Sequence, residues 1–330
     1  MPNVAIEEIR NISKIALFQH GALDWVSGEV ADAVAASESV GNRICGLYYL
    51  ESYCEQLISG RVNGQASPTV QSVRSGSIFV DADDGFAQPA FSKGLPEAIK
   101  LAKKNGIASL SVGRAHTCTS LGYFTKKIAE AGFLGLGLTN ASPIVAPPGG
   151  KSRIIGTNPI AFSVPNGSGG VAMQFDQSTT TVALGKITMA KAAGESIPQG
   201  WALDKDGNAT TDPEEALKGT LVSAGGYKGW GFGLMAEILV AGMTGGRISK
   251  NVAPLKAKDG EPHNLGQFYI IIDPASGASF YNRLEELTTI ISSEEGTRMP
   301  GQYTVPKTEV DVPDELWNLA VSLTKAKQSE

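Results

Sequence analysis

The sequence predicts an α/β protein with three layers, α/β/α, built around a mixed sheet and preceded by an N-terminal helical region. Helical spacing dominates the first sixty residues, and strands then alternate with helices, the pattern of a sheet covered by helices. Two apolar runs, 160–164 and 171–175, are separated by the sequence NGSGG and therefore predict a hairpin. Because a hairpin pairs its strands antiparallel, it makes the sheet mixed.

The N-terminal region is predicted to contain three helices. The first covers residues 6–18, where isoleucines recur on one helical stripe at Ile6, Ile9, Ile12 and Ile15. A second helix is expected over 24–37 and a third over 47–58, which ends at Gly60.

The sheet region begins with a strand at 77–81 and a helix at 96–104, for which Gly106 is suited to the left-handed cap. A second group of elements follows in strand–helix–strand order, at 107–112, 120–131 and 133–139. After the hairpin come helices at about 179–193 and 230–241.

The C-terminal part starts with a long polar loop, 247–263, that contains Pro and Gly. His263 on this loop either reaches a cleft or, as expected here, lies at the surface. A strand at 267–273 and helices near 283–293 and 313–325 complete the chain. Asp311 is a candidate N-cap of the last helix, with Pro313 in its first turn.

Composition narrows the functional classes. A chain of 330 residues is long enough for one large domain or two ordinary ones. A net charge of −5 argues against non-specific nucleic-acid binding. The three cysteines form no C-x-x-C motif and the three histidines share no ligand spacing, so neither a disulfide framework nor a metal site is expected. The absence of a membrane-length apolar run and of a signal-peptide pattern predicts a reduced, cytoplasmic setting.

Three blocks pair glycine with hydroxyl, amide or lysine side chains. They are GTNPIAF (156–162), FDQSTTTVALGKI (175–187) and GGYKG (225–229). None is a standard nucleotide motif, but glycine lets a phosphate approach the backbone while the polar side chains supply donors. Lys228 could act as a point charge on a pyrophosphate. The alternative is that Lys228 caps a helix and that Gly225 and Gly226 only form a turn.

Together with TNASPIVAPPGG (139–150), IPQGWALDKDG (197–207) and TRMPG (297–301), these blocks resemble the malate/L-lactate dehydrogenase family over most of the chain. That family also contains sulfolactate, ureidoglycolate and diketogulonate dehydrogenases and the Δ1-piperideine-2-carboxylate/Δ1-pyrroline-2-carboxylate reductases. The resemblance implies an NAD(P)-dependent oxidoreductase with a non-Rossmann nucleotide fold, a homodimer, and active sites near a domain cleft. It divides the chain into an N-terminal helical region (1–75), a substrate and dimerisation domain (76–110 and 255–330) and an NAD(P)-binding domain (111–254).

The resemblance also assigns cofactor contacts. NADP(H) is favoured over NAD(H) by analogy with the reductase branch, and no metal is implied. The expected cofactor-binding residues are His116, Thr117, Ser120, Thr139, Asn140, Thr157, Asn158, Asp176, Ser178, Thr179, Lys186, Gly226, Lys228 and Arg298.

The family's Ser-His-Gly motif, with an arginine three residues past the glycine, is missing. The family's proton-donating histidine aligns with Cys45, its serine with Ile44, and its arginine, which binds the substrate carboxylate, with Tyr49. Gly46 and Tyr53 match the family and fix this alignment. Reduction of a 2-keto acid creates an alkoxide that needs a positioned acid, but a cyclic imine can enter already protonated. The loss therefore favours a reductase of cyclic ketimine 2-carboxylates. DGFAQPA (84–90) points to the same branch, whereas Gly-Lys-Ile at 185–187 resembles the hydroxy-acid branch.

Several residues are candidates to replace the lost groups. His116 is either a surrogate acid or a cofactor or backbone contact. Lys186 could donate a proton, hold a carboxylate or bind the cofactor. Arg43 is either a carboxylate clamp or a surface residue, and Tyr49, like Tyr48, either donates its hydroxyl to substrate or packs. Cys45 is either a catalytic residue, although a poor proton donor, or a small buried filler.

Two alternatives to imine reduction remain open at this point. A small anionic 2-keto acid could be the substrate, with His116 or Lys186 as the acid. The chain could instead bind NAD(P) without catalysing a reaction, since the serine, histidine and arginine of the motif are all absent.

Overall fold

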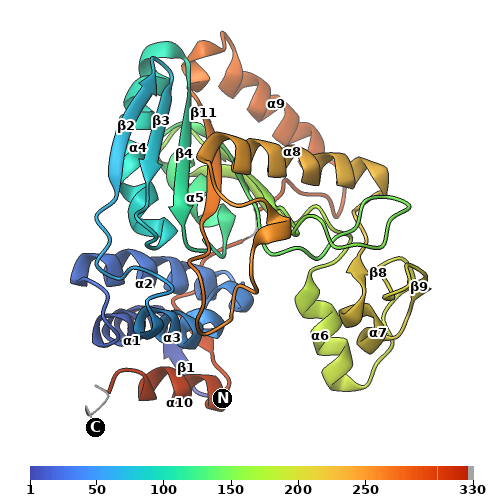
Figure 1. Ribbon diagram of the computed structural model, residues 1–330. Coiled ribbons are helices and arrows are strands. Elements are labelled where there is room, and N and C mark those ends of the chain that lie inside the picture. The colour runs from blue at the N-terminus through green and yellow to red at the C-terminus, as the bar shows by residue number, and fades with distance from the viewer. Residues whose placement is uncertain (303, 326–330) are drawn as a thin grey trace.

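A computed structural model describes residues 1–302 and 304–325, and its centre is a seven-stranded sheet in the order β2-β3-β4-β11-β5-β6-β7 (Figure 1). Only β3 and β4 pair in parallel within this sheet, and the other neighbours pair antiparallel, so the predicted mixed sheet is confirmed. The strands are β2 (Thr69–Arg74), β3 (Ser77–Asp81), β4 (Ile107–Ala115), β5 (Leu134–Thr139), β6 (Ile160–Pro165), β7 (Val171–Gln177) and β11 (Leu265–Ile272).

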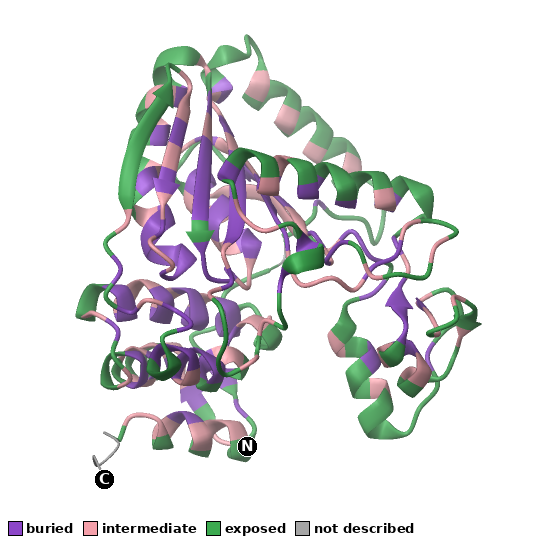
Figure 2. Cartoon of the chain, viewed as in Figure 1, coloured by how far each residue is buried: buried purple, intermediate pink, exposed green. Residues whose placement is uncertain are grey.

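Helices cover both faces of the sheet and complete the predicted three layers. The helices α4 (Ala87–Asn105) and α5 (Leu121–Glu130) pack on one face, with Phe91, Leu121 and Phe124 fully buried between them and the strands. The helix α8 (Tyr227–Thr244) lies across the other face, where Ala236 and Val240 contact Leu138 and Phe268. Figure 2 shows the central strands as the most buried part of the molecule, whereas the edge strand β2 is exposed along its whole length.

The N-terminal helical region forms a second core. Its helices are α1 (Ile6–Gln19), α2 (Asp24–Ser39) and α3 (Leu50–Ser59), with two 3₁₀ turns, η1 (Arg43–Cys45) and η2 (Leu47–Tyr49), between the last two. The end of the chain returns to this region, because β12 (Glu309–Asp311) pairs with β1 (Asn3–Ala5) and α10 (Asp314–Ser322) packs on the same core.

A separate small lobe was not predicted as a unit. It contains α6 (Leu184–Ala193), α7 (Pro213–Lys218) and a short sheet of β8 (Ala202–Leu203), β9 (Ala209–Thr210) and β10 (Thr220–Leu221). Ile187, Ile197 and Leu221 belong to its own apolar core. The last helix of the sheet region, α9 (Phe280–Ser292), has no buried residue.

Some predicted boundaries are wrong for identifiable reasons. Helix α4 starts at Ala87 and not at 96, because Pro96 is accommodated inside the helix and does not begin it. Helix α6 starts at Leu184 and not at 179, since the backbone of Thr179 bonds to Thr157 and that of Ala224 bonds to Thr179. Asp311 is not an N-cap: it lies in β12, and Pro313 precedes the first residue of α10.

The polar segment 247–263 is a loop as predicted, interrupted only by the 3₁₀ turn η3 (Ser249–Asn251). No helix among the described residues is both long enough and apolar enough to cross a bilayer.

The predicted domain ranges cut across this sheet. It takes β2 from range 1–75, β3 and β11 from the substrate range, and β5, β6 and β7 from the NAD(P)-binding range. Residues 303 and 326–330, which belong to the predicted substrate and dimerisation domain, lie outside the described residues. The three-part division therefore stays a prediction about function and does not describe the packing.

Candidate active site

Most of the predicted cofactor contacts lie at the end of the sheet where several strands finish, which we call the sheet edge. Because β11 is antiparallel to both β4 and β5, and β3 is parallel to β4, the strands β3, β4 and β5 all end at this edge. Antiparallel β6 begins there and β7 ends there. The loops at this edge are 81–85, 114–120, 139–140, 156–159 and 176–180. The sheet therefore brings together residues as far apart in sequence as Asp81 and Thr180.

Asp176, at the end of β7, is fixed to the start of helix α5. Its Oδ2 accepts a hydrogen bond from Gly122 N at 2.7 Å and lies 3.4 Å from Ser120 Oγ, the N-cap residue. A helix N-terminus favours a carboxylate at this place. Burial nevertheless raises the pKa of Asp176, and the hydrogen bonds only partly offset this effect. The residue is crowded by protein and still exposed to solvent, as expected for a group near the domain cleft that the family resemblance implies.

The segment that lacks the Ser-His-Gly motif lies next to Asp176. Burial raises the pKa of the Cys45 thiol to about 12, and the negative charge of Asp176 adds to this effect. Burial also raises the pKa of Tyr49 to about 12, with smaller contributions from Cys45, Tyr48 and Cys118. Burial likewise raises the pKa of the Cys118 thiol. The thiols of Cys45 and Cys118 and the phenol of Tyr49 therefore remain protonated and uncharged at neutral pH. We call Cys45, Tyr49, Cys118 and Asp176 the cleft residues.

Two contacts fix this segment. Glu38 Oε1 accepts a hydrogen bond from Leu47 N at 2.8 Å, and a side chain at Gly46 would collide with that carboxylate, which explains why glycine is kept there. Ile44 reaches the small lobe: a Cβ added to Gly185 would lie 2.7 Å from Ile44 Cδ1. The cleft residues therefore lie where the N-terminal region, the sheet edge and the small lobe meet.

His116 is buried and its hydrogen bonds define its protonation. Gln56 Nε2 donates to the carbonyls of Leu255 (2.8 Å) and Ala257 (2.6 Å), so Gln56 Oε1 faces His116 Nε2 at 2.6 Å. Nε2 is thus the donor, and Nδ1 keeps a lone pair with no partner among the described residues.

His263 stacks on His116 with ring centroids 4.1 Å apart, and its Nδ1 accepts from Thr117 N at 3.3 Å. The expectation that His263 lies at the surface is wrong, since only 3% of it is exposed. The loop 247–263 folds back over α3, a tertiary contact that no local pattern encodes.

Both imidazoles are held neutral. Burial is the main cause that lowers the pKa of His116 well below 6.5, and His263 and Arg61 add to it. Burial likewise lowers the pKa of His263 to about 3. At neutral pH His116 is therefore an uncharged ring whose single N–H is already bonded to Gln56.

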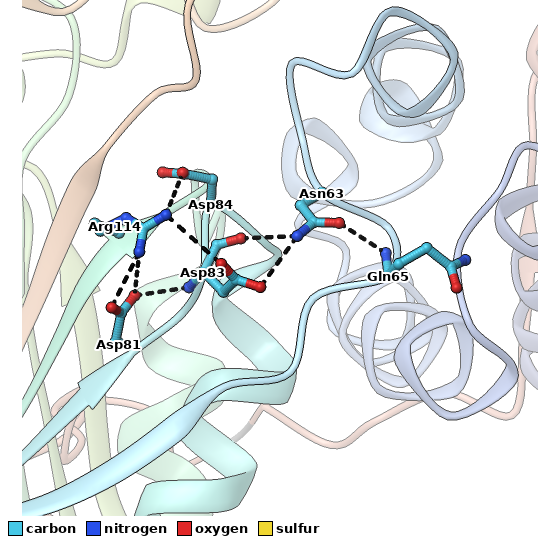
Figure 3. Close-up of polar contacts among 6 residues, drawn as sticks. All are labelled: Asn63, Gln65, Asp81, Asp83, Asp84 and Arg114. Atoms are coloured by element: carbon cyan, nitrogen blue, oxygen red, sulfur yellow. Dashed lines mark hydrogen bonds and ion pairs between the residues drawn. The ribbon is translucent and has the colours of Figure 1, made fainter.

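An ion-pair cluster holds the loop that carries His116 (Figure 3). Arg114 pairs with Asp81 at 3.1 Å and with Asp84 at 2.5 Å, and Asn63 Nδ2 donates to the Asp83 carbonyl at 3.1 Å. His116 N, two residues after Arg114, donates to Gly85 O at 2.9 Å. The cluster thus fixes the ends of β3 and β4 relative to each other.

Several predicted cofactor contacts make internal hydrogen bonds around Glu237 of α8. Asn158 Nδ2 donates to Glu237 Oε2 at 2.7 Å, while Asn140 Nδ2 donates to the Arg247 carbonyl at 2.8 Å. Ser249 also donates to Glu237, through its backbone N at 2.6 Å and its hydroxyl at 2.5 Å. The Thr139 hydroxyl bonds to the Gly266 carbonyl. The side chains of Thr139, Asn140 and Asn158 are buried and support the loops of the edge.

The N-terminus of α8 is open to an anion. Gly225 and Gly226 have positive φ angles of 63° and 65°, and no side chain caps the helix that begins at Tyr227. Lys228 is exposed in the first helical turn. The glycines do form a turn and Lys228 does lie at a helix start, but the uncapped N–H groups and the lysine also make a typical phosphate site.

Other predicted residues border this site. Thr179 N donates to the Thr157 carbonyl at 2.9 Å, and the hydroxyls of Ser178 and Thr180 lie 2.9 Å apart. Arg298 is exposed on a turn that docks on β7 through the Gln174 N to Pro300 O bond of 3.0 Å.

The remaining candidates lie farther out. Lys186 is exposed in the first turn of α6, beside the Ile44 contact, and Arg43 is exposed in η1. Across residues 1–302 and 304–325 no cluster of three His, Cys, Asp or Glu side chains is suited to a metal ion.

The similarity of this chain to known proteins makes it an oxidoreductase. The model of the malate/L-lactate dehydrogenase family matches residues 4–310, and the chain belongs to that family. It is 36% identical over 299 residues to the (2R)-3-sulfolactate dehydrogenase (NADP(+)) of Chromohalobacter salexigens, covering 90% of this chain and 89% of the relative. It is 33% identical over 310 residues to a Δ1-pyrroline-2-carboxylate/Δ1-piperideine-2-carboxylate reductase of Pseudomonas putida, covering 93% and 91%.

Solved structures agree with this assignment. The Δ1-piperideine-2-carboxylate reductase of Pseudomonas syringae pv. tomato superposes with a TM-score of 0.91 at 29% identity, covering 98% of this chain and all of that one. The sulfolactate dehydrogenase of Methanocaldococcus jannaschii superposes with a TM-score of 0.90 at 26% identity, covering 98% and 96%.

Sequence reasoning missed Gln56 and Arg61, which are buried under the loop 247–263, and gave Cys118 no part in the cleft. One signal was present in the sequence. Gln56 lies in an amphipathic helix and Arg61 directly follows it, and polar side chains that are buried there need hydrogen-bond partners.

The neutral histidine pair predicts a loss of stability in acid. Because the pKa of each imidazole is lower in the folded chain than the unfolded value of about 6.5, the unfolded chain binds more protons below that pH. Each pH unit below about 6.5 should therefore cost up to roughly 1.4 kcal/mol of unfolding free energy for each histidine. Urea unfolding between about pH 7 and about pH 5 measures this slope.

The variant His263→Phe should keep the stacked ring and remove one of the two titrating groups, so its slope should be shallower. A free energy of unfolding that does not change over this pH range would contradict the buried, neutral pair.

Proposed function

We propose that the protein reduces a cyclic ketimine 2-carboxylate, such as Δ1-pyrroline-2-carboxylate or Δ1-piperideine-2-carboxylate, to the cyclic amino acid with NAD(P)H. The observation that supports this most is the chemistry of the cleft residues. Cys45, Tyr49 and Cys118 are uncharged, and the fourth group is the carboxylate of Asp176.

This arrangement favours a cationic substrate. A protonated imine near Asp176 gains attraction of about 3 kcal/mol for unit charges ~5 Å apart at an effective dielectric constant of about 20. The alkoxide that develops from a 2-keto acid would be repelled by a similar amount. A cationic ring at this place would also lower the pKa of Asp176, which keeps the carboxylate ionised. The substrate brings its own proton, so Cys45 does not have to supply one.

The residues at the sheet edge fit a dinucleotide. The uncapped start of α8, the twin glycines Gly225 and Gly226, and the exposed Lys228 would hold a pyrophosphate. His116, which is buried, would support the loop at the cofactor site and would not touch the cofactor through its ring. When bound, the reduced nicotinamide supplies the hydride.

We propose NADP(H) in preference to NAD(H). The sulfolactate dehydrogenase relative is named for NADP(+), whereas a ureidoglycolate dehydrogenase of Escherichia coli, 31% identical over 271 residues, is named for NAD(+). Location in the cytoplasm remains part of the proposal.

A 2-hydroxy-acid dehydrogenase is the second candidate, favoured by the 36% identity to the sulfolactate dehydrogenase. It would need an acid, and Lys186 and His116 are the candidates. Lys186 lies at the small lobe and can approach the cleft beside Ile44, whereas the N–H of His116 is committed to Gln56. A chain that binds NAD(P) without turnover is the third candidate.

The outer face of α8 supports a homodimer. The side chains of Phe232, Ile238 and Met243 are 55%, 62% and 52% exposed, and Met235 is 38% exposed. A stripe of large apolar side chains on one helix is unusual for a monomer surface. We propose that a second copy of the chain covers it.

Substrate choice is tested by steady-state assays with purified protein. We expect kcat/KM for the two cyclic imines to exceed that for pyruvate, oxaloacetate or sulfopyruvate by at least about a hundredfold, which corresponds to the ~3 kcal/mol charge effect. NADPH should be preferred to NADH in the same assay. Higher kcat/KM for any of the keto acids would instead support the dehydrogenase, and a His116→Ala or Lys186→Ala variant would then identify its acid.

The dimer is tested by light scattering after gel filtration. Wild-type protein should have twice the mass of one chain, and Ile238→Glu should approach the mass of one chain, because a buried carboxylate would lose hydration without a partner. The matched control is Val73→Glu on the exposed edge strand β2, where the residue is 53% exposed. A monomeric wild type, or a dimeric Ile238→Glu variant, would refute the α8 interface.

A further inference from the structure

The segment 254–263, which we call the strap, is bound to α3 by buried polar side chains. Gln56, fully buried, donates to the carbonyls of Leu255 and Ala257. Arg61, 1% exposed, donates to the carbonyls of Pro254 at 3.1 Å and Glu261 at 3.2 Å. Buried donors of this kind are costly to leave unpaired, so the strap has one fixed conformation.

The strap places one lysine on the turn η2, which we call the aromatic turn because it carries Tyr48 and Tyr49. Lys256 Nζ lies 3.6 Å from the ring centroid of Tyr48 and 5.3 Å from that of Tyr49. It donates one hydrogen bond, to the Tyr48 carbonyl at 3.0 Å. An ammonium carries three donors, so two remain for other groups. Lys256 is exposed to solvent, and no ion pair of its ammonium occurs among the described residues.

Lys256 differs in this respect from Lys258, two residues further on the same strap. Lys258 pairs with Glu55 at 2.5 Å and lies away from the two tyrosines. The strap thus carries one lysine engaged by a carboxylate and one held over Tyr48 and Tyr49 with donors to spare.

We propose that Lys256 binds the carboxylate of the substrate. This inference rests on the proposed function only in that the substrate is a small carboxylate. Tyr49 connects Lys256 with the cleft, because its phenol is close enough to Cys45 and Cys118 to affect their titration, and Cys45 is close enough to Asp176. A ligand that reached from Lys256 to Asp176 would have its negative end at the ammonium and its positive end at the carboxylate. A zwitterionic iminium 2-carboxylate has this distribution of charge.

The aromatic turn also explains how the lysine stays available. Cation–π contact with Tyr48 orients the ammonium without neutralising it, which a salt bridge would do. Arg43, the other cation considered for this role, lies in η1 near Glu38; burial raises the pKa of Glu38, and the charge of Arg43 offsets this effect only in part.

The test compares Lys256→Met with Lys258→Met. The methionine keeps an apolar stem on Tyr48 and removes the charge. We expect KM for the imine to rise at least about tenfold in Lys256→Met, the effect of losing one charge-assisted contact, with kcat and KM for NADPH changed little. Lys258→Met should behave like wild type, and Lys256→Arg should recover most of the loss. An unchanged KM in Lys256→Met would overturn the inference while leaving the proposed function intact.

A binding measurement makes the test independent of turnover. Calorimetry with pyrrole-2-carboxylate and its uncharged carboxamide, with and without NADP+, isolates the contribution of the carboxylate. Wild-type protein should bind the carboxylate more tightly than the carboxamide, and Lys256→Met should lose that difference. Such a result would support the inference even if the protein reduced no imine. Equal affinities of wild-type protein for the two compounds, or no binding of the carboxylate by wild type, would refute it.

Discussion

The hydrogen bond from the first turn of α5 to Asp176 determines the character of the cleft. It joins the end of β7 to the start of a helix on the sheet face, so the carboxylate cannot turn away from the segment that carries Cys45. In this family that segment is expected to provide an imidazole, and here it provides a thiol that stays neutral. A site with a carboxylate and uncharged neighbours is suited to a substrate that arrives with a positive charge, and the proposed function depends on this one constraint.

A second network holds the three parts of the cleft together. Gln56 on α3 joins His116, at the sheet edge, to the strap, and His263 of the strap stacks on His116. Every member is buried, so the N-terminal region and the sheet share one polar core at this point. The same network that keeps His116 neutral also positions Lys256. In the proposed site, the position of the positive charge would thus depend on a tertiary contact and not on residues adjacent in the sequence.

The layers, the mixed sheet and most helices could be predicted because they depend on local periodicity and on turn residues such as Gly106. The family could be predicted because its glycine-containing blocks are contiguous in sequence. The strap could not: the burial of His263 depends on Gln56 and Arg61, about 200 residues away, and no spacing rule connects them. The absence of the Ser-His pair was visible in the sequence, but the Asp176 carboxylate beside Cys45 required the sheet topology. For the same reason Asn140 and Asn158 were predicted only as cofactor contacts, because the buried Glu237 that binds Asn158 is distant in sequence.

The most direct test of the central claim is the substrate preference of Asp176→Asn, which removes the negative charge and keeps an oxygen that can accept from Gly122. The ratio of kcat/KM for Δ1-piperideine-2-carboxylate to that for a 2-keto acid should fall at least about a hundredfold relative to wild type, with loss of imine activity as the main cause. An unchanged ratio in a folded variant that still binds NADPH would show that the carboxylate does not select the cationic substrate.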